Sequence, residues 1–502
     1  MGAGGGGAGG LRAAARARPR GGAPPPRGAP AGGESGARGG GGAGAGDAAH
    51  AAGGGAARGG FLGRRGALRV RAPPPAAPAP AHVAFVVPPL TGHINPTVAV
   101  GQALLARGHR VTWVGHAEAL ARSLPAPLPP GGAVWALGEH LSAERLGALH
   151  AGREARGLAA FQFLWEGVLL PLAEEGYAEV LAALAALKPD LCVVDQQALA
   201  GALACRALGL PWLTSCTTSA AIVDALGELT QLKGWLDAQR ARLLAALPLA
   251  EATRAQVAAE EREMGSFELS PRGVLVFSSE RLARAAHPEA RFGEVYHFVG
   301  PALKVARAPI PFDWSLLRAG VSRVYFSLGT LNGERGARVY AALCEALGGE
   351  AGLQVIAAAP PALFPSPPPE NFVVCARVPQ LELLRHVDLV VTHAGHNTTC
   401  EALAHGLPLL ALPIKDDQPV VAEQVRAVGA GLRLPFGRVT APRLREAVWR
   451  LLREPSFREA ARGVAAEFAR EDGADGGARV VEGALRARGA GGGAGGLGAL
   501  RK

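Results

Sequence analysis

Hydrophobic runs of strand length alternate with helical patterns along most of the chain. Residues 82–87 form an apolar run rich in β-branched side chains, a helical pattern covers 96–107, and a second strand pattern follows at 110–115. Asn95 and Pro96 are typical of a helix start, with asparagine as the N-cap and proline at the first helical position. Strand, capped helix and strand in close succession predict a βαβ unit, and therefore a parallel, doubly wound sheet.

Two long segments repeat this alternation. The first predicts further strands at 191–195, 210–215, 274–279 and 295–300 and a helix at 198–209. The second predicts strands at 324–330, 353–359, 371–375, 388–395 and 407–414 and a helix near 337–347. The proline-rich stretch 301–320 between the two segments is typical of a linker. The fold class is therefore predicted to be α/β, with two Rossmann-like parallel-sheet domains that face a cleft.

The two ends of the chain have a different composition. Residues 1–81 consist mainly of Gly, Ala, Pro and Arg, and the tail over 487–502 is rich in Gly and Ala. Neither segment can bury enough apolar surface to offset the entropy of an ordered chain, so both are predicted to be disordered. The boundaries that follow are an N-terminal domain over 82–303, a linker over 304–320 and a C-terminal domain over 321–486. The Arg-rich, acid-poor extension is compatible with a transit peptide, and equally with an extension that has no role.

Most of the positive charge lies in that extension. The formal net charge is +10, and residues 1–81 hold eleven Arg, no Lys and two acidic residues, so the extension carries +9 and the rest of the chain about +1. A near-neutral body excludes a uniformly basic core that binds nucleic acid. Six isolated cysteines argue against a disulfide-built secreted protein, and no apolar run reaches the ~18 residues of a spanning helix. We predict a cytoplasmic monomer with at most a peripheral membrane contact, or a plastid protein if the extension is a transit peptide.

Polar side chains gather where one predicted strand of the second segment meets the next helix. The connecting loop is HAGHN, and a helix N-terminus offers unpaired N–H groups and a partial positive charge to anions. His393, Asn397 and Thr398 add polar hydrogens at this point. Gly395 lets a ligand approach the backbone closely. The loop therefore predicts a diphosphate site.

Three further residues suit the rest of a nucleotide sugar. Glu401 lies one turn into the same predicted helix, where its carboxylate can accept hydrogen bonds from a ribose. Asp417 and Gln418 follow the next predicted strand and offer the acceptors and donors that sugar hydroxyls require. Neither predicted domain has a GxGxxG motif after its first strand, and no GxxxxGK[ST] motif occurs, which argues against a dehydrogenase and a P-loop protein.

Residues 376–419 resemble the donor-binding signature of family 1 glycosyltransferases, the UDP-glycosyltransferase family. The resemblance is carried by Pro379-Gln380, the HxGxNT pattern, the helical glutamate, Gly406-Leu407-Pro408 and the closing Asp-Gln pair. It extends over essentially all of 82–485, and in appearance it is strongest to bacterial zeaxanthin and macrolide glucosyltransferases. The resemblance implies the GT-B fold, with acceptor binding in the N-terminal domain and nucleotide-sugar binding in the C-terminal domain.

The resemblance also implies a set of donor-binding residues. They are Thr330, Arg377, Val378, Gln380, His393, Gly395, Asn397, Thr398, Glu401, Asp417 and Gln418. Thr330 belongs to SLGT, whose counterpart lines the diphosphate pocket, and Arg377 stands where plant members stack a tryptophan on uracil, so the base preference stays open. No DxD motif for a metal follows a strand. We therefore expect no metal and no cofactor, with the helix dipole and His393 offsetting the diphosphate charge.

A catalytic base is expected in the first βα loop. Transfer requires an acceptor hydroxyl to attack the anomeric carbon, and a positioned base contributes about 10²–10⁴ in rate. His93 lies in this loop, where the helix N-terminus disfavours imidazolium and so helps keep the ring a neutral base. Asp195 ends a strand at the same sheet edge and can steady the ring, although it could equally cap the helix at 198–209. The resemblance assigns the two residues to the family's His–Asp dyad.

The implied activity is that of an inverting hexosyltransferase. It would move a hexose, with glucose as the default, from a UDP-sugar to a hydroxyl of a small lipophilic acceptor such as a carotenoid or terpenoid. The acceptor pocket is expected at the helices over 160–185 and the segment after Pro211. Two alternatives stay open. One is a non-catalytic nucleotide-sugar-binding subunit, which would be expected to lose the base or its partner, and the other is a GT-B sugar-nucleotide epimerase, which needs additional acids in the cleft.

Overall fold

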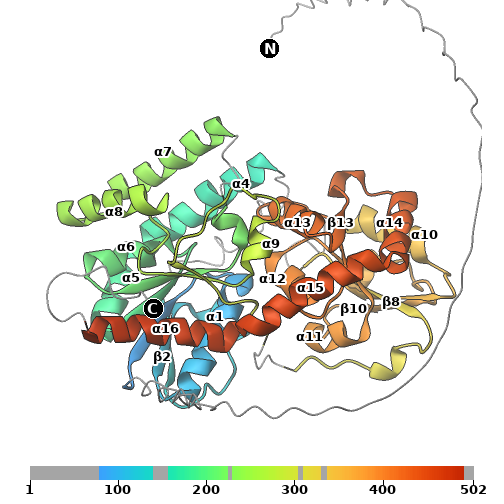
Figure 1. Ribbon diagram of the computed structural model, residues 1–502, viewed down its shortest axis with the longest axis horizontal. Coiled ribbons are helices and arrows are strands. Elements are labelled where there is room, and N and C mark those ends of the chain that lie inside the picture. Colours follow the sequence, from blue (N-terminus) through green and yellow to red (C-terminus); the bar gives the residue numbers. More distant parts are fainter. Residues whose placement is uncertain (1–78, 139–156, 224–228, 304–308, 330–335, 491–502) are drawn as a thin grey trace, which may run out of the picture. The chain divides into compact units, whose positions relative to one another are not determined.

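Two parallel β-sheets, one in each half of the chain, form the framework of the protein (Figure 1). The computed structural model describes residues 79–138, 157–223, 229–303, 309–329 and 336–490. Almost all of the predicted N-terminal extension and part of the predicted linker lie outside these residues. The predicted α/β class with two Rossmann-like sheets is confirmed.

The first sheet has seven strands in the order β3-β2-β1-β4-β5-β6-β7, and neighbouring strands are parallel. The strands are β1 (His82–Val86), β2 (Arg110–His116), β3 (Gly132–Leu137), β4 (Leu191–Asp195), β5 (Trp212–Cys216), β6 (Val274–Val276) and β7 (Tyr296–Phe298). The order reverses between β1 and β4. At such a switch point the loops after the two strands diverge and leave a crevice in which ligands bind.

The second sheet repeats this topology with six parallel strands in the order β10-β9-β8-β11-β12-β13. The strands are β8 (Ser322–Ser327), β9 (Leu353–Ala358), β10 (Phe372–Cys375), β11 (Leu389–Thr392), β12 (Leu409–Ala411) and β13 (Gly431–Arg433). Its switch point lies between β8 and β11. The segments that follow these two strands are therefore the expected ligand site of the second half.

Helices connect the strands in both halves. In the first half they are α1 (Thr91–Ala106), α2 (Ala117–Ser123), α4 (Leu158–Leu164), α5 (Leu170–Leu187), α6 (Leu199–Ala207), α7 (Thr230–Ala246), α8 (Glu251–Met264) and α9 (Glu280–Arg284), with a π-helical turn η2 (Trp165–Leu169) before α5 and a 3₁₀ turn η3 (Ser219–Ala221) after β5. In the second half they are α10 (Ala337–Leu347), α11 (Gln380–Leu383), α12 (His396–Ala404), α13 (Gln418–Ala427), α14 (Ala441–Arg453), α15 (Pro455–Glu471) and α16 (Gly473–Ala490).

Two strands, β3 and β13, were not predicted from the sequence. Both are edge strands, at the ends of their sheets. In β3, Val134 is 43% exposed and Trp135 is 37% exposed. An edge strand has a single neighbour and less covered surface, so its sequence does not need the continuous apolar run of a central parallel strand.

Helix α1 begins five residues earlier than predicted. Its N-cap is Leu90, which makes no side-chain cap hydrogen bond, and Pro96 lies inside the helix. The prediction that Asn95 caps the helix is therefore wrong, and His93 lies in the first helical turn instead of a loop. Since proline has no N–H, α1 lacks the hydrogen bond that residue 96 would make to the carbonyl of Gly92. That carbonyl finds a partner elsewhere, as described below.

Close packing of α1 on β2 fixes the orientation of the helix. A Cβ atom added at Gly101 would lie 2.3 Å from Cζ2 of Trp113, so only glycine lets the helix approach the tryptophan ring this closely. Nε1 of Trp113 donates a hydrogen bond of 3.2 Å to Oγ1 of Thr97. These contacts determine which side of α1 faces the sheet, and hence where the first turn of the helix points.

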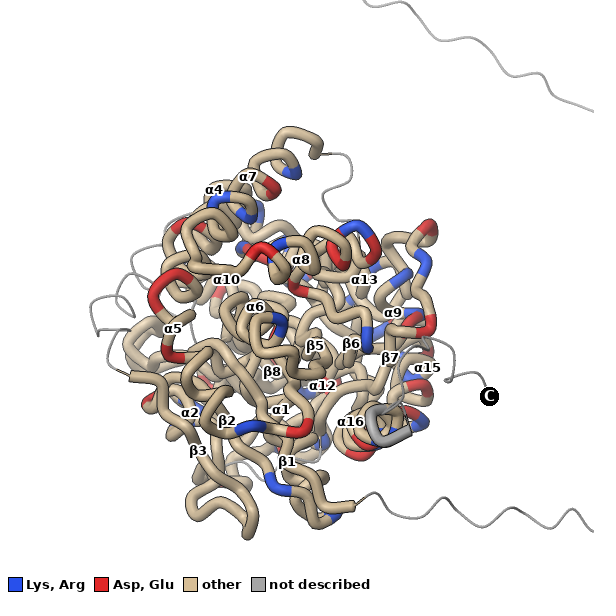
Figure 2. Tube along the Cα trace, turned by 90° about the vertical axis from the view of Figure 1, so that its left-hand side faces the viewer, with Lys and Arg blue, Asp and Glu red and all other residues tan. Residues whose placement is uncertain are grey.

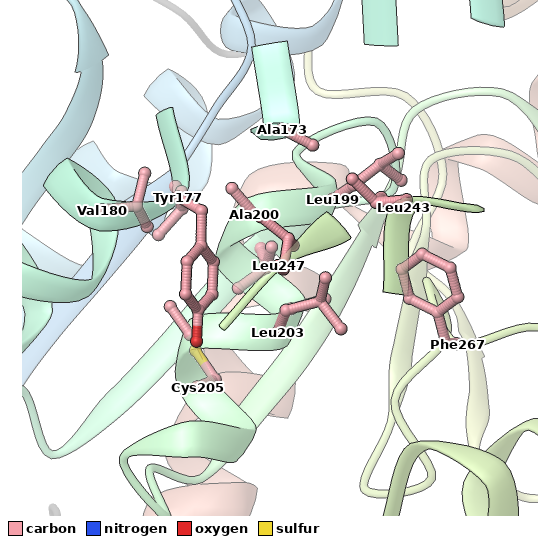
Figure 3. Close-up of a cluster of buried hydrophobic side chains, with 14 of the residues drawn as sticks. Ala173, Tyr177, Val180, Leu199, Ala200, Leu203, Cys205, Leu243, Leu247 and Phe267 are labelled. Atoms are coloured by element: carbon pink, nitrogen blue, oxygen red, sulfur yellow. The ribbon is translucent and has the colours of Figure 1, made fainter. Parts of the chain in front are cut away.

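A large apolar cluster joins α5, α6 and α7 to the first sheet. Tyr177 and Val180 of α5, Leu203 of α6 and Leu243 of α7 belong to it (Figure 3), and each is at most 3% exposed. Trp165 lies in the same cluster. The aromatic and leucine-rich part of 160–185 therefore contributes mainly to the core.

The last helix, α16, belongs by sequence to the second half but packs on the first. Ala478 and Val481 lie in the cluster formed with α1 and the first sheet, and Figure 1 shows α16 beside α1. At the end of α1, Arg107 forms ion pairs with Asp475 (2.8 Å) and Glu482 (3.0 Å). The helix continues to Ala490, so the disordered tail predicted from residue 487 begins too early. The other predicted domain boundaries remain predictions.

Charges of both signs are interspersed on the face shown in Figure 2. This distribution accords with the near-neutral composition of the chain after residue 81. Among the helices that the structure describes, none is both long and apolar enough to cross a membrane.

Candidate active site

His93 and Asp195 contact each other at the switch point of the first sheet. Nδ1 of His93, in the first turn of α1, lies 2.9 Å from Oδ1 of Asp195 at the end of β4. The Asp195 side chain is fully buried, whereas that of His93 is 17% exposed. A carboxylate that holds the proton on Nδ1 leaves the lone pair on Nε2, which is the tautomer that a general base requires.

Opposing influences act on the pKa of His93. Burial is the largest and lowers it, but the charge and the hydrogen bond of Asp195, together with the charge of Asp417 in the second half, raise it by more. The pKa of His93 therefore lies above its ordinary value. This direction is opposite to the one expected from the helix N-terminus alone. A raised pKa gives a stronger base that is neutral only at higher pH.

The carboxylate of Asp195 has a second partner in its own loop. Its Oδ1 accepts a hydrogen bond of 2.9 Å from the backbone N–H of Gln197. Helix α6 begins only at Leu199, and its N-cap residue Ala198 receives no side-chain cap bond. Asp195 is therefore not the helix cap that was one reading of the sequence. It holds the loop after β4 and the His93 ring together.

Thr217 is a third member of this cluster, and sequence reasoning missed it. Its Oγ1 lies 2.8 Å from Nδ1 of His93 and donates a hydrogen bond of 3.4 Å to Oδ2 of Asp195. The residue comes directly after β5, the neighbour of β4, and is buried. The signal that could have found it is a hydroxyl immediately after a central strand, in a segment that was assigned only to the acceptor pocket.

His393 lies at the switch point of the second sheet. It follows β11, and Gly329 follows the neighbouring strand β8. A Cβ atom at Gly329 would lie 2.6 Å from Cε1 of His393, and one at Gly395 would lie 2.5 Å from Nε2. Gly395 has an ordinary φ of −61°, so it serves by leaving space for the ring. The imidazole is therefore held between two glycines.

Burial lowers the pKa of His393 to about 4. The charge of Asp417 and a hydrogen bond with the backbone of Ser327 oppose this only in part. The ring is therefore neutral at pH 7 in the free protein. Without a bound anion the neutral ring offers a hydrogen bond and no positive charge, and the expectation that His393 offsets diphosphate charge stays a prediction. An anion bound beside the ring would raise its pKa.

The first turn of α12 carries the predicted diphosphate residues. Gly395 is its N-cap, and Asn397 and Thr398 follow. Nδ2 of Asn397 donates a hydrogen bond of 2.7 Å to the carbonyl oxygen of Gly92, so this side chain reaches the first half. Oγ1 of Thr398 accepts a bond of 3.4 Å from Nε2 of Gln380.

Gln380 and Glu401 form a second connected pair. Nε2 of Gln380 donates to Oε2 of Glu401 at 2.5 Å, and the hydroxyl of Tyr325 donates to Oε1 of Gln380 at 2.8 Å. Glu401 is only 4% exposed. Together with Asn397 it lines a small pocket of about 290 Å³ that also touches Pro96 of α1. The predicted ribose-binding carboxylate is thus held in place beside the first half.

The other predicted donor residues are placed as follows. Asp417 is the N-cap of α13, and Oε1 of Gln418 accepts the N–H groups of Ile414 (2.9 Å) and Lys415 (3.1 Å). This amide therefore orders the loop after β12. Two residues follow β10: the Arg377 side chain is exposed, and that of Val378 is buried in the core of the second half. Thr330 lies outside the described residues.

An apolar pocket of about 630 Å³ opens at the carboxyl ends of the first sheet. Leu172 and Gly176 of α5 line it, as do Pro88 and Pro89, which precede α1. This matches the helical part of the expected acceptor pocket, whereas no described residue after Pro211 lines it. The chain therefore offers a mainly apolar space beside the residues that precede α1, and His93 itself is not among the lining residues.

Two polar atoms belong to residues that line this pocket. Nδ1 of His116 and Oε1 of Gln197 are buried and find no hydrogen-bond partner among the described residues. Unpaired buried polar atoms are costly unless a ligand or water satisfies them. Among the described residues there is also no cluster of His, Cys, Asp and Glu that could hold a metal; metal independence remains a prediction.

The fold and the site together define a class of protein. Two parallel Rossmann-like sheets, one in each half of the chain, correspond to the GT-B fold. A solved structure, the glycosyltransferase of kitacinnamycin, has this fold: its TM-score is 0.60 at 24% identity, covering 81% of this chain and 100% of that one.

Sequence comparison agrees. Residues 357–475 match the C-terminal domain of proteins like erythromycin biosynthesis protein CIII. The NDP-glycosyltransferase YjiC of Bacillus subtilis (strain 168) is 30% identical over 376 residues, which are 73% of this chain and 88% of that protein. Demethyllactenocin mycarosyltransferase of Streptomyces fradiae is 29% identical over 442 residues (83% and 89%). Zeaxanthin glucosyltransferase of Pantoea ananas is 28% identical over 374 residues (70% and 84%).

The chain belongs to the family 1 glycosyltransferases, the UDP-glycosyltransferase family. The predicted family, fold class and class of enzyme are confirmed. The alternative of a non-catalytic subunit is not favoured, because the relatives are named as enzymes and this chain brings a histidine and a buried carboxylate together.

Proposed function

We propose that the protein transfers a hexose, with glucose as the default, from a UDP-sugar to a hydroxyl of a small lipophilic acceptor, with inversion at the anomeric carbon. The observation that carries this proposal is the 2.9 Å contact between His93 and the buried Asp195. An imidazole oriented by a carboxylate is the arrangement of a general base. In the sugar-transfer reaction of this family, such a base would remove the proton of the acceptor hydroxyl.

The proposed reaction is a single displacement. Nε2 of His93 takes the proton of the acceptor hydroxyl while that oxygen bonds to the anomeric carbon. The bond from this carbon to the diphosphate breaks, and UDP leaves with the electron pair. Asp195 stabilises the imidazolium that forms, and Thr217 supports the carboxylate from its other side. A base of this kind contributes about 10²–10⁴ in rate.

We assign the donor to the switch point of the second half. The N-terminus of α12 supplies N–H groups to the diphosphate, and His393 supplies a hydrogen bond from a neutral ring. Glu401 is proposed to accept bonds from the ribose, and Asp417 and Gln418 to contact the sugar. The exposed Arg377 is free to stack on the base. No metal or cofactor is proposed, and the protein is proposed to act as a monomer in the cytoplasm, with at most a peripheral membrane contact.

We assign the acceptor to the apolar pocket beside α5. Its lining suits a carotenoid, terpenoid or other lipophilic alcohol, and one relative is named for zeaxanthin. The unpaired atoms of His116 and Gln197 favour an acceptor with a second polar group besides the hydroxyl that reacts. A plain hydrocarbon alcohol would leave both atoms unsatisfied.

The test is a transfer assay with the purified chain. Wild type and His93→Ala are incubated with UDP-glucose and a panel of lipophilic alcohols, each as a mono-ol and a diol, and products are measured by mass spectrometry. We expect transfer by the wild type, with the diols preferred, and a loss of 10² or more in kcat for the variant. UDP binding by calorimetry should be equal in both proteins.

The outcomes are separable. Near-wild-type turnover of His93→Ala would overturn the assignment of the base. Transfer with equal efficiency to mono-ols and diols would overturn the polar-group requirement alone. If UDP does not bind and dTDP does, the UDP-sugar is the wrong donor class.

A further inference from the structure

Two elements of the first half hold His93, and each is bonded to the second half. The first is the turn of α1 that contains Gly92 and His93. The second is the segment after β5, where Thr217 contacts the His93 ring and Ser219 begins the turn η3. Each is joined by a hydrogen bond, called a tie below, to a helix that carries predicted donor residues.

The tie to α1 follows from the proline inside the helix. In an uninterrupted helix the N–H of residue 96 would bond to the carbonyl of residue 92. Pro96 has no N–H, so this carbonyl is left without its intrahelical donor. Nδ2 of Asn397, at the start of α12, donates to it at 2.7 Å. A hydrogen bond from the second half thus replaces the one that the helix lacks, next to the base.

The tie to η3 is made by Gln424 of α13, which no part of the sequence reasoning singled out. Its side chain is completely buried. Oε1 accepts a hydrogen bond of 2.9 Å from the hydroxyl of Ser219, and Nε2 donates one of 3.2 Å to the carbonyl of Ala283. Both polar atoms of the Gln424 side chain are therefore hydrogen-bonded to residues of the first half.

These two ties come from the helices that carry the donor residues. α12 begins at the diphosphate loop, and α13 begins at Asp417 and Gln418. We infer that Gln424 and Asn397 are positioning residues: they hold the His93 ring in register with the donor by bonding the elements on either side of it. This inference rests on the proposed role of His93 as the base. Hydrogen bonds then connect the elements that hold the base to the helices that hold the donor, although base and donor lie in different halves.

The experiment uses full-length Gln424→Leu, Ser219→Ala and the double variant. We expect kcat at saturating UDP-glucose and acceptor to fall about ten-fold in Gln424→Leu and about three-fold in Ser219→Ala. The Kd of UDP should stay within two-fold of wild type, because neither residue is proposed to touch the donor. The double variant should lose no more than Gln424→Leu alone, since both remove the same bond.

Asn397→Ala tests the other tie. We expect a three- to five-fold loss of kcat at saturating donor. If only the Kd of UDP weakens and kcat is unchanged, Asn397 is a donor ligand and not a positioning residue. Arg281→Gln is the matched control, because it breaks an exposed ion pair with Glu467 that also joins the halves but does not adjoin His93. Its kcat should stay within two-fold of wild type.

The results separate the possible failures. A lowered thermal midpoint with wild-type kcat in Ser219→Ala and Gln424→Leu would show a merely structural role and overturn the inference. Should Gln424→Leu not fold, Ser219→Ala, which removes a single hydroxyl, still decides. If His93→Ala is inactive while these variants turn over normally, only this inference fails. If His93→Ala is active, the proposed function fails first.

Discussion

His93 and His393 lie at the switch points of the two sheets, on opposite sides of them, and their pKa values shift in opposite directions. Each follows a strand at the switch point of its sheet, and each is influenced by Asp417. The pKa of His93 lies above its ordinary value, whereas that of His393 is lowered to about 4. Burial acts on both rings in the same direction.

The difference comes from the partner that each ring has. His93 is bonded to the buried carboxylate of Asp195. His393 is packed between Gly329 and Gly395 and has no carboxylate hydrogen bond among the described residues. A charged hydrogen-bond partner outweighs desolvation, and without one desolvation prevails. The same residue type, placed at the switch point of each sheet, thus suits a base in one half and a neutral donor to an anion in the other.

Removing the carboxylate should make the two histidines alike, and this is the largest expected effect. Asp195→Asn should lower kcat by about 10² or more, since the tautomer and the imidazolium lose their support. The pKa of His93 should fall, because burial lowers it and only the charge of Asp417 would then oppose burial. The acid limb of kcat/KM, which should lie above pH 6.5 in the wild type, should move to lower pH. An unmoved limb would show that another group titrates.

The lowered pKa of His393 can be tested through its effect on the stability of the protein. The unfolded chain binds a proton on residue 393 below about pH 6.5, whereas the folded protein does so only near pH 4. Stability from the neutral ring is therefore complete above pH 6.5 and is lost as the pH falls toward 4. Between pH 7 and pH 5 this amounts to about 2 kcal/mol of unfolding free energy.

The variant His393→Gln isolates this contribution. Denaturant unfolding of variant and wild type at pH 7 and pH 5 should show a smaller loss in the variant by about that amount. Other titrating groups, including His93, whose raised pKa acts with the opposite sign, cancel in the comparison. Equal losses in both proteins would contradict a depressed pKa for His393.

A methyl group at Gly395 should displace the His393 ring without altering His93. Because φ at Gly395 is ordinary, Gly395→Ala introduces the 2.5 Å clash without backbone strain. We expect the KM for the donor to rise about ten-fold while the acid limb of kcat/KM stays in place. Gly483→Ala is the control, since a Cβ there meets nothing within 4 Å. A normal donor KM in Gly395→Ala would mean that the ring position is not needed.

The smallest effect is expected at Thr217. Thr217→Val keeps the shape of the side chain and removes the hydroxyl near Nδ1 of His93 and Oδ2 of Asp195. The bond to the carboxylate is long, at 3.4 Å, so its loss corresponds to a few-fold change, and kcat should fall about three- to ten-fold. Steady-state assays at saturating substrates would measure it. A loss as large as that of Asp195→Asn would mean that Thr217 takes a more direct part in the reaction.

The central strands and the residues that follow them could be predicted from the sequence. Strands β1, β4 and β11 are continuous apolar runs, and His93, Asp195 and His393 come after or at the end of them. Parallel strands bring their carboxyl ends to one edge, so the proximity of His93 to Asp195 was predictable too. The edge strands could not be predicted, because they lack a continuous apolar run. The first turn of α1 could not be predicted either, because Asn95 and Pro96 gave a local helix-start signal five residues too late.

What the sequence alone determined is therefore the alternation of strands and helices, the family, and the residues at the switch points. Only the tertiary structure decided the start of α1, the role of Thr217, the ties through Gln424 and Asn397, and the direction of each histidine's pKa. The physical reason is the separation along the chain between the groups that interact. Periodicity and turn residues act between near neighbours in the chain, whereas a buried ring or carbonyl takes its properties from groups that folding brings beside it, such as Asp195 for His93 and Asn397 for Gly92.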